Sequence, residues 1–88
     1  MTYEIVYTKD ARKSLNKMDA ATSGAIVSWI DKNLIGTDDP RRMGKALTGK
    51  LAGVWRYRVG DFRIFAKIED ERLIILILDV RNRRRAYR

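Results

Sequence analysis

The second half of the chain restricts the fold more than any other feature of the sequence. Two runs typical of strands, residues 51–59 and 62–68, flank Gly60-Asp61, a two-residue signal for the turn of a β-hairpin. After a short charged turn, residues 73–80 are almost all apolar, as in a central strand that is covered on both faces. This half therefore predicts three consecutive strands.

The first half predicts a short strand followed by two helices. Residues 3–7 are rich in β-formers, and Thr8 is suited to cap a helix that starts directly after it. The second helix should start within residues 19–22 and stop near Gly36, and residues 36–50 should form a loop. Apolar residues at helical spacing mark the two buried faces: Ala11, Leu15 and Met18, then Ile26, Ile30 and Leu34.

This order, β-α-α-β-β-β, predicts an α+β fold in which two N-terminal helices pack on a small twisted, mainly antiparallel four-stranded sheet. With 88 residues, 45% of them apolar, we expect one domain over residues 1–88 with one core. There is no basic and then apolar leader, and the longest apolar run, residues 73–78, is far shorter than the about 20 residues that span a bilayer. We therefore expect a cytoplasmic protein without a membrane partner.

The net charge of +8 is concentrated in the second half of the chain. Residues 1–40 contain five Lys/Arg and six Asp/Glu, whereas residues 41–88 contain fourteen and five, a balance of +9. Such asymmetry favours a polyanionic partner, nucleic acid in particular, over a basic face kept only for solubility. Cysteine and histidine are both absent, which argues against thiolate or imidazole metal sites. We expect no metal and no other cofactor.

Residues 44–50, G-K-A-L-T-G-K, match the first seven positions of a phosphate-binding loop. The match fails at Leu51, where such a loop needs a Ser or Thr hydroxyl to bind magnesium. No strand is predicted before the segment and no helix after it, so we interpret it as a flexible loop. Its lysines, Lys45 and Lys50, remain candidates for contacts with nucleic-acid phosphate.

The predicted hairpin carries arginines on one face. Because side chains alternate along a strand, Arg56 and Arg58 point away from the apolar side chains beside them. A two-residue turn would place Arg58 directly opposite Arg63, and like charges in that arrangement destabilise a sheet. A phosphate between the two guanidinium groups would remove this cost, since guanidinium binds phosphate in bidentate fashion. The alternative is that both arginines extend into solvent or meet carboxylates such as Asp61 and Glu69.

A basic tail follows the last predicted strand. Its arginines, Arg81, Arg83, Arg84 and Arg85, should lie near one end of the basic face, and Tyr87 can stack on a base. The alternative is a disordered cationic tail. Cleavage of RNA by its own 2′-hydroxyl needs proton removal, stabilisation of the charged phosphorane and protonation of the leaving 5′-oxygen. Arginines suit the second task, and a tyrosine can be the base if nearby cations lower its pKa, whereas arginine is a poor acid.

Three stretches of the chain resemble the RelE/ParE superfamily of bacterial toxin–antitoxin toxins, and within it the RelE-like mRNA interferases. They are residues 39–47, residues 55–64 (W-R-Y-R-V-G-D-F-R-I) and residues 79–87. The resemblance implies a compact toxin that enters the ribosomal A site, cleaves the mRNA there and so inhibits translation. It also implies an acidic cognate antitoxin that binds the toxin, with operator DNA bound only through that complex.

The same resemblance implies roles for five residues. Arg56 and Arg58 would hold the phosphate together with Arg63, which follows the turn. Arg83 would act as the general acid, and Tyr87 as the general base. The tail departs from the family where Arg81 replaces a usual glycine, and its arginine-to-tyrosine spacing is shorter, which leaves the other tail arginines open as the acid. The wider set expected to bind RNA consists of Lys45, Lys50, Arg81, Arg84 and Arg85.

Two other functions stay open. A ParE-like gyrase inhibitor would share the fold and act by binding, although such chains usually have longer helices and lack the arginine and tyrosine set. A nucleic-acid-binding module without toxicity would also explain the charge asymmetry. A small acidic reading frame beside the gene would exclude such a module.

Overall fold

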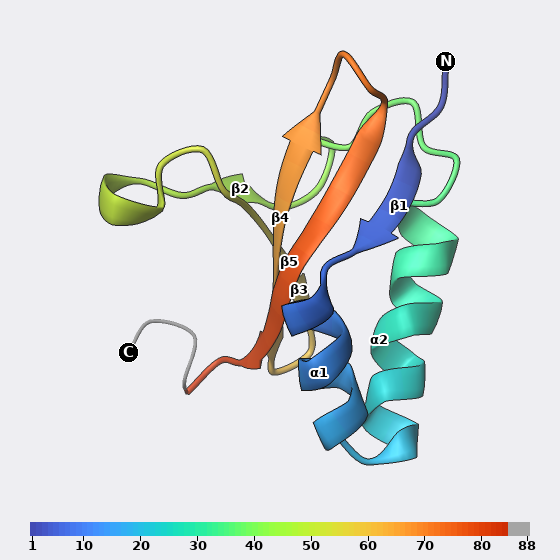
Figure 1. The fold of residues 1–88 in the computed structure, drawn as a ribbon, viewed down its shortest axis with the longest axis vertical. Helices are drawn as coiled ribbons and strands as arrows, with labels where there is room; N and C mark the ends of the chain where they lie inside the picture. Colours follow the sequence, from blue (N-terminus) through green and yellow to red (C-terminus); the bar gives the residue numbers. More distant parts are fainter. Residues whose placement is uncertain (85–88) are drawn as a thin grey trace.

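A computed structural model describes residues 1–84, in which one five-stranded sheet is combined with two helices (Figure 1). The strands lie in the order β1-β5-β4-β3-β2, so the last strand in the chain lies inside the sheet. Within the described residues, no helix is long and apolar enough to cross a membrane. The elements are β1 (Glu4–Tyr7), α1 (Lys9–Lys17), α2 (Ala20–Asn33), β2 (Lys45–Ala46), the short 3-10 helix η1 (Gly49–Leu51), β3 (Trp55–Val59), β4 (Phe62–Glu69) and β5 (Ile74–Asn82).

The predicted helix starts are confirmed. The side chain of Thr8 accepts a hydrogen bond from the Ala11 amide (3.1 Å) before α1, and that of Asp19 accepts one from the Thr22 amide (2.7 Å) before α2. These bonds satisfy amides that the first turn of a helix leaves unpaired. The predicted stop is confirmed as well, since α2 ends shortly before Gly36, whose φ of 75° is accessible to glycine at little steric cost.

The predicted hairpin is confirmed in its register. β3 and β4 pair antiparallel, with Arg58 opposite Arg63 and Arg56 opposite Phe65, as a two-residue turn requires. Gly60 in that turn has a φ of 57°, in the left-handed region that such turns use. The positions of the hairpin arginines on one face therefore follow directly from the sequence pattern.

The prediction of four strands is wrong by one. Lys45 and Ala46 form β2, inside the segment expected to be a loop, and pair antiparallel with β3. Two residues are too few to show the alternation by which a strand is recognised in a sequence. β1 pairs parallel with β5 while all other pairs are antiparallel, so the sheet is mixed.

Several strand boundaries also differ from the prediction, most clearly those of β3 and β5. The strand expected over residues 51–59 starts only at Trp55, because Gly49–Leu51 forms η1. β5 begins after Leu73, whose φ of 54° belongs to the preceding turn, and it extends further than expected. This extension brings Arg81, the first arginine of the basic tail, into the sheet.

A β-bulge in β5 decides which of its side chains face the helices. Phe65 pairs with Asp79 while the next residue, Ala66, pairs with Ile77, so Leu78 is an extra residue on β5. Because the bulge shifts the alternation, the buried residues of β5 change from odd to even positions along the strand.

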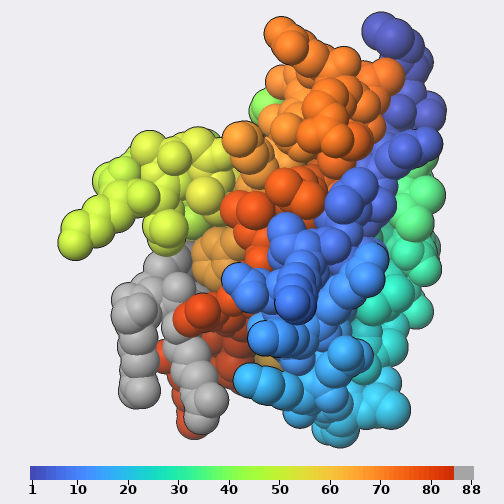
Figure 2. Space-filling view, in the orientation of Figure 1, coloured from blue at the N-terminus to red at the C-terminus, as the bar shows by residue number. Residues whose placement is uncertain are grey.

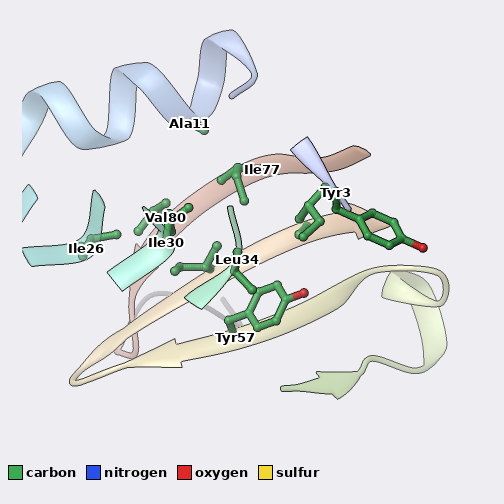
Figure 3. Close-up of a cluster of buried hydrophobic side chains, with 11 residues drawn as sticks. Tyr3, Ala11, Ile26, Ile30, Leu34, Tyr57, Ile77 and Val80 are labelled. Carbon is green, nitrogen blue, oxygen red and sulfur yellow. The ribbon is translucent and has the colours of Figure 1, made fainter. Parts of the chain in front are cut away.

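The hydrophobic core lies between the helices and one face of the sheet (Figure 3). Tyr57, in the middle of β3, is fully buried there, and its hydroxyl donates a hydrogen bond to the carbonyl oxygen of Pro40. Because side chains alternate along a strand, burial of this face leaves the opposite face of β3, β4 and β5 for charged residues. The buried core residues are Tyr3, Ala11, Ile26, Ile30, Leu34, Tyr57, Ile64, Ala66, Ile75, Ile77 and Val80.

Candidate nucleic-acid interface

Three arginines form a row across the sheet, on the face opposite the core. Arg58 of β3 lies directly opposite Arg63 of β4, and Arg63 lies directly opposite Arg81 of β5. Their strand neighbours Tyr57 and Ile64 are buried against the helices, so alternation directs the arginines to the other side. We call Arg58, Arg63 and Arg81 the arginine row.

The charges of the arginine row are only partly neutralised by residues 1–84. Arg58 is exposed and makes no ion pair with this part of the chain. Arg63 is only 7% exposed, and its Nη1 donates to backbone carbonyl oxygens at 3.2 and 3.4 Å. Arg81 donates from Nε to Asp79 at 2.7 Å. Adjacent like charges destabilise a sheet, and a buried guanidinium without a carboxylate is costly, so the row is suited to bind an anion.

Asp79 supplies the carboxylate of the row and connects it to α1. Its Oδ1 accepts hydrogen bonds from Ser14 Oγ (2.6 Å) and the Val80 amide (2.8 Å), and its Oδ2 accepts from Arg81. Burial alone would raise the pKa of Asp79, but the hydrogen bonds from Ser14 and Arg81 hold it below its ordinary value. Asp79 was not among the predicted site residues, although its position two residues before Arg81 on the same strand was a usable signal.

The carboxylates considered as alternative partners do not pair with the arginine row. In the described part of the chain, Glu69 pairs with Arg72 at 3.2 Å, in the turn before β5, and the Asp61 side chain pairs with no arginine of the row. The backbone oxygen of Asp61 accepts a hydrogen bond from the Arg83 amide at 2.6 Å. This bond holds Arg83, the expected general acid, beside the hairpin turn.

The segment after β5 borders a hollow at the hairpin turn. The hollow has a volume of about 360 Å³ and is lined by Asp61, Asn82, Arg83 and Arg84. The Arg84 amide donates to the Asn82 side chain at 3.0 Å, which turns the chain out of the sheet. Arg85 and Tyr87, expected to bind RNA and to act as the general base, lie outside the described residues.

A second cross-strand row lies beside the arginine row. Lys45 of β2 is directly opposite Arg56 of β3, and Arg56 is opposite Phe65 of β4. Lys45 is exposed and Arg56 is half-buried. Both therefore share the sheet face with the arginine row, as expected of RNA-binding residues. Lys50 lies in η1, which projects from the β2 edge of the sheet, away from α2 (Figures 1 and 2).

Residues 44–50 are not a nucleotide-binding loop, in agreement with the sequence analysis. They form β2 and the start of η1 rather than a turn between a strand and a long helix. Gly44 has a φ of 86°, and a Cβ there would lie 2.4 Å from the carbonyl oxygen of Arg56 and 2.6 Å from Nε1 of Trp55. This glycine therefore serves the close approach of the chain to β3.

The tyrosines of residues 1–84 serve the fold. The hydroxyl of Tyr3 donates to Asp70 at 2.6 Å, which raises the pKa of Tyr3. Burial, and then the nearby Asp31, raise the pKa of Tyr7, and burial raises the pKa of Tyr57. A tyrosine base needs a lowered pKa, so none of the three is suited to that role. Over the same residues, no group of three or more acidic side chains could hold a metal ion.

Comparison with known proteins gives consistent matches over nearly the whole chain. The family model described as the ParE toxin of the type II toxin–antitoxin system, parDE, matches residues 5–87. Toxin RelG of Mycobacterium tuberculosis is 34% identical over 88 residues, which cover 100% of this chain and 99% of the relative. Toxin RelE of the same organism is 28% identical over 86 residues, which cover 98% of this chain and 87% of the relative. A chain in the crystal structure of the RelBE2 toxin–antitoxin complex of M. tuberculosis matches with a TM-score of 0.80 and 30% identity, covering 94% of this chain and all of that one.

These matches agree with the resemblance indicated by the hairpin sequence. The two relatives are named as toxins, and the solved structure is that of a toxin–antitoxin complex. The match with the family extends through the helices, the hairpin and the last strand. The chain therefore belongs to the RelE/ParE superfamily, as a toxin of a type II toxin–antitoxin system related to RelE.

Proposed function

We propose that this toxin is a ribosome-dependent endoribonuclease that cleaves mRNA in the A site and so inhibits translation. The arginine row is the observation that supports the proposal most directly, because only Arg81 of its three arginines pairs with a carboxylate among residues 1–84. A bound phosphate would supply the missing negative charge. The phosphorane formed during cleavage carries more negative charge than the phosphate, so the row would bind the transition state more tightly than the substrate.

In the proposed reaction the 2′-hydroxyl oxygen of one nucleotide attacks the adjacent phosphorus, and the bond from phosphorus to the 5′-oxygen of the next nucleotide breaks. The products are a 2′,3′-cyclic phosphate and a free 5′-hydroxyl. Tyr87 takes the proton from the 2′-hydroxyl. Arg56, Arg58 and Arg63 stabilise the phosphorane. Arg83 donates a hydrogen bond to the leaving oxygen, which receives its proton from water, and no metal ion takes part.

The ribosome has a necessary part in this scheme. Tyr87 remains for the role of base because the other three tyrosines of the chain are engaged in the fold with raised pKa values. A phenol and an arginine form a weak acid–base pair at neutral pH. The ribosome would compensate by holding the mRNA bent, with the attacking oxygen in line with the bond that breaks. Naked RNA should therefore be cut slowly or not at all.

The test is to add the full-length toxin to ribosomes programmed with a defined mRNA and to map the product ends. The wild type should cut in the A site and leave a 2′,3′-cyclic phosphate. Tyr87→Phe should still bind the ribosome but cut roughly 10²–10⁴-fold more slowly, the usual effect of one acid–base group. Arg72→Gln, a change in the turn before β5, is the control and should cut at the wild-type rate. Normal cutting by Tyr87→Phe would exclude Tyr87 as the base, and a wild type that never cuts would refute the proposal.

The alternative function is inhibition of DNA gyrase by binding, because the matching family model is that of ParE. The helices of this chain, 9 and 14 residues long, do not favour it, since ParE-like chains usually have longer ones. A supercoiling assay separates the two functions. Inhibited supercoiling together with intact ribosomal mRNA would establish the alternative.

The proposed partner in the resting cell is an acidic antitoxin. A similar chain of M. tuberculosis was solved in a toxin–antitoxin complex. An acidic segment would neutralise the arginine row, and its apolar residues would bind as a helix in a groove or as an added strand. Co-expression with the adjacent reading frame should give a cytoplasmic complex that resists moderate salt, and only this complex should bind operator DNA. A copurifying partner without acidic character would refute this account of the interface.

A further inference from the structure

A small cleft opens beside β3, where β2 ends. β2 pairs only with Trp55 and Arg56, so among residues 1–84 no strand neighbours the rest of the outer edge of β3. The cleft has a volume of about 180 Å³ and is lined by Trp29, Met43, Gly44, Lys45, Arg56 and Arg58. It therefore joins α2, the segment before β2 and the cationic face of β3 at one place.

The walls of this cleft are held by the fold. Nε1 of Trp55 donates to the carbonyl oxygen of Met43 at 2.8 Å and so fixes the segment before β2 against β3. Gly44 brings the same segment closer than any residue with a side chain would allow. On the other side, the ring of Trp29 packs at a tilt against the buried Tyr57, with 5.8 Å between ring centroids. The cleft is thus a preformed feature rather than a gap between mobile side chains.

The charge of the cleft is suited to an anion. The part of its lining that belongs to the described residues contains one lysine and two arginines and no acidic residue. Lys45 and Arg58 are exposed and make no ion pair with residues 1–84. Lys45 also lies directly opposite Arg56, which brings a third cationic side chain to the cleft. The cleft therefore repeats, at the edge of the sheet, the charge pattern of the arginine row.

The apolar part of the cleft is suited to a nucleobase. Trp29 is half-buried and Met43 is exposed, so both present apolar surface at the cleft. Aromatic side chains beside cationic groups are the usual composition of sites for single-stranded nucleic acid, because every base has a face that can stack. Arg58 belongs both to this cleft and to the arginine row, so a ligand in the cleft would be adjacent to a phosphate on the row.

We propose that this cleft binds one nucleotide of single-stranded RNA, next to the nucleotide whose phosphate the arginine row holds. The base contacts Trp29 and Met43, and its phosphate is bound by Lys45 and Arg58. The choice of RNA as the ligand rests on the proposed function. The site would hold the chain on both sides of the bond to be cut, which helps to keep the reacting atoms in line.

The experiment uses the full-length toxin and a tetranucleotide with 2′-O-methyl groups, which binds but cannot be cleaved. Lys45→Gln should reduce the slope of log Kd against log salt by about 0.7, the contribution of one phosphate contact on a single strand. Lys67→Gln, at an exposed lysine of β4 outside the cleft, is the matched control and should leave the slope unchanged. Trp29→Leu should weaken binding by about 5- to 150-fold, the usual effect of losing one stacked base. It should have no effect on a probe in which the stacked base is absent.

The outcomes separate this proposal from the proposed function. If Lys45→Gln behaves like Lys67→Gln, the cleft does not bind phosphate and the proposal is overturned, even where Arg58→Gln weakens binding. If Trp29→Leu is folded and binds every probe like the wild type, no nucleobase stacks on Trp29 and the proposal is overturned. Should Trp29→Leu fail to fold, the comparison of Lys45→Gln with Lys67→Gln still decides. A wild type that cleaves ribosomal mRNA although the tetranucleotide never enters the cleft would refute this inference alone.

Discussion

Replacing Arg58 with glutamine should stabilise the folded toxin. Arg58 is exposed, lies directly across from Arg63 and has no carboxylate partner among residues 1–84. Like charges in that arrangement destabilise a sheet by about 0.2–1 kcal/mol. Because 1 kcal/mol corresponds to about 4–8 °C for a domain of this size, Arg58→Gln should melt about 1–8 °C above the wild type in low salt. The gain should shrink in high salt, where the repulsion is screened.

The same substitution should weaken the binding of RNA, which makes the prediction two-sided. Loss of one phosphate contact should lower the slope of log Kd against log salt by about 0.7 for a single strand. A residue that destabilises the free protein and strengthens ligand binding is retained for function rather than for folding. Thermal unfolding at two salt concentrations and fluorescence anisotropy with a labelled oligonucleotide measure the two effects on the same samples.

Lys67→Gln is the matched control for Arg58→Gln. Lys67 of β4 is exposed on the same sheet face as the arginine row, but the residue opposite it on β5 is Leu76, so it faces no cation there. Its replacement removes the same charge and should change neither the melting temperature nor the salt slope appreciably. Equal melting temperatures of the two variants would refute repulsion within the arginine row. A wild-type slope for Arg58→Gln would show that Arg58 does not bind phosphate.

Three further predictions concern the framework of the site. Asp79→Asn should lower the free energy of unfolding by about 1 kcal/mol at pH 7. The effect is small because Arg81, its partner, is half-exposed, and solvent weakens the charged hydrogen bond between them. Because the folded-state pKa of Asp79 is lowered, its contribution to stability is present above the unfolded pKa of about 3.9 and is lost as the pH falls from there through the folded-state pKa. The melting temperature of the variant should therefore fall less steeply than that of the wild type as the solution is acidified. Gly44→Ala should lower the free energy of unfolding by about 2 kcal/mol or more, because the new Cβ would clash with the carbonyl oxygen of Arg56 and because φ at this position is positive. An unchanged melting temperature would contradict this. Tyr57→Phe should cost roughly 1–3 kcal/mol in urea unfolding, since the buried carbonyl of Pro40 loses its donor, and a smaller effect would show that water replaces the hydroxyl.

The hairpin was predictable because local rules determine its geometry. A two-residue turn at Gly60-Asp61 leaves a single pairing register, and the alternation of side chains then decides which face each residue occupies. Arg58 opposite Arg63 follows from these two rules alone. The helix caps at Thr8 and Asp19 were predictable for a similar reason, since each depends on one side chain and an amide three residues later.

The rest of the site depends on contacts between distant segments. β2 exists because Gly44 lets the chain approach β3, and a two-residue strand has no periodicity of its own. The bulge at Leu78 changes the alternation of β5, which no pattern within that apolar run reveals. The contact of Asp79 with Ser14 joins residues 65 positions apart, and the cleft at Trp29 likewise requires the position of α2 beside β3.

The arginine row can exist in the free toxin because the other face of the same strands stabilises them by more than the row costs. Full burial of one large aliphatic side chain contributes about 1.5–3 kcal/mol. Ile64 and Val80, which pair with each other across β4 and β5, are almost completely buried directly beside the row. Each like-charge pair across the row costs only about 0.2–1 kcal/mol, and Asp79 offsets part of that. The two faces of the sheet thus have separate tasks: the core face holds the strands in register, and that register keeps three guanidinium groups side by side.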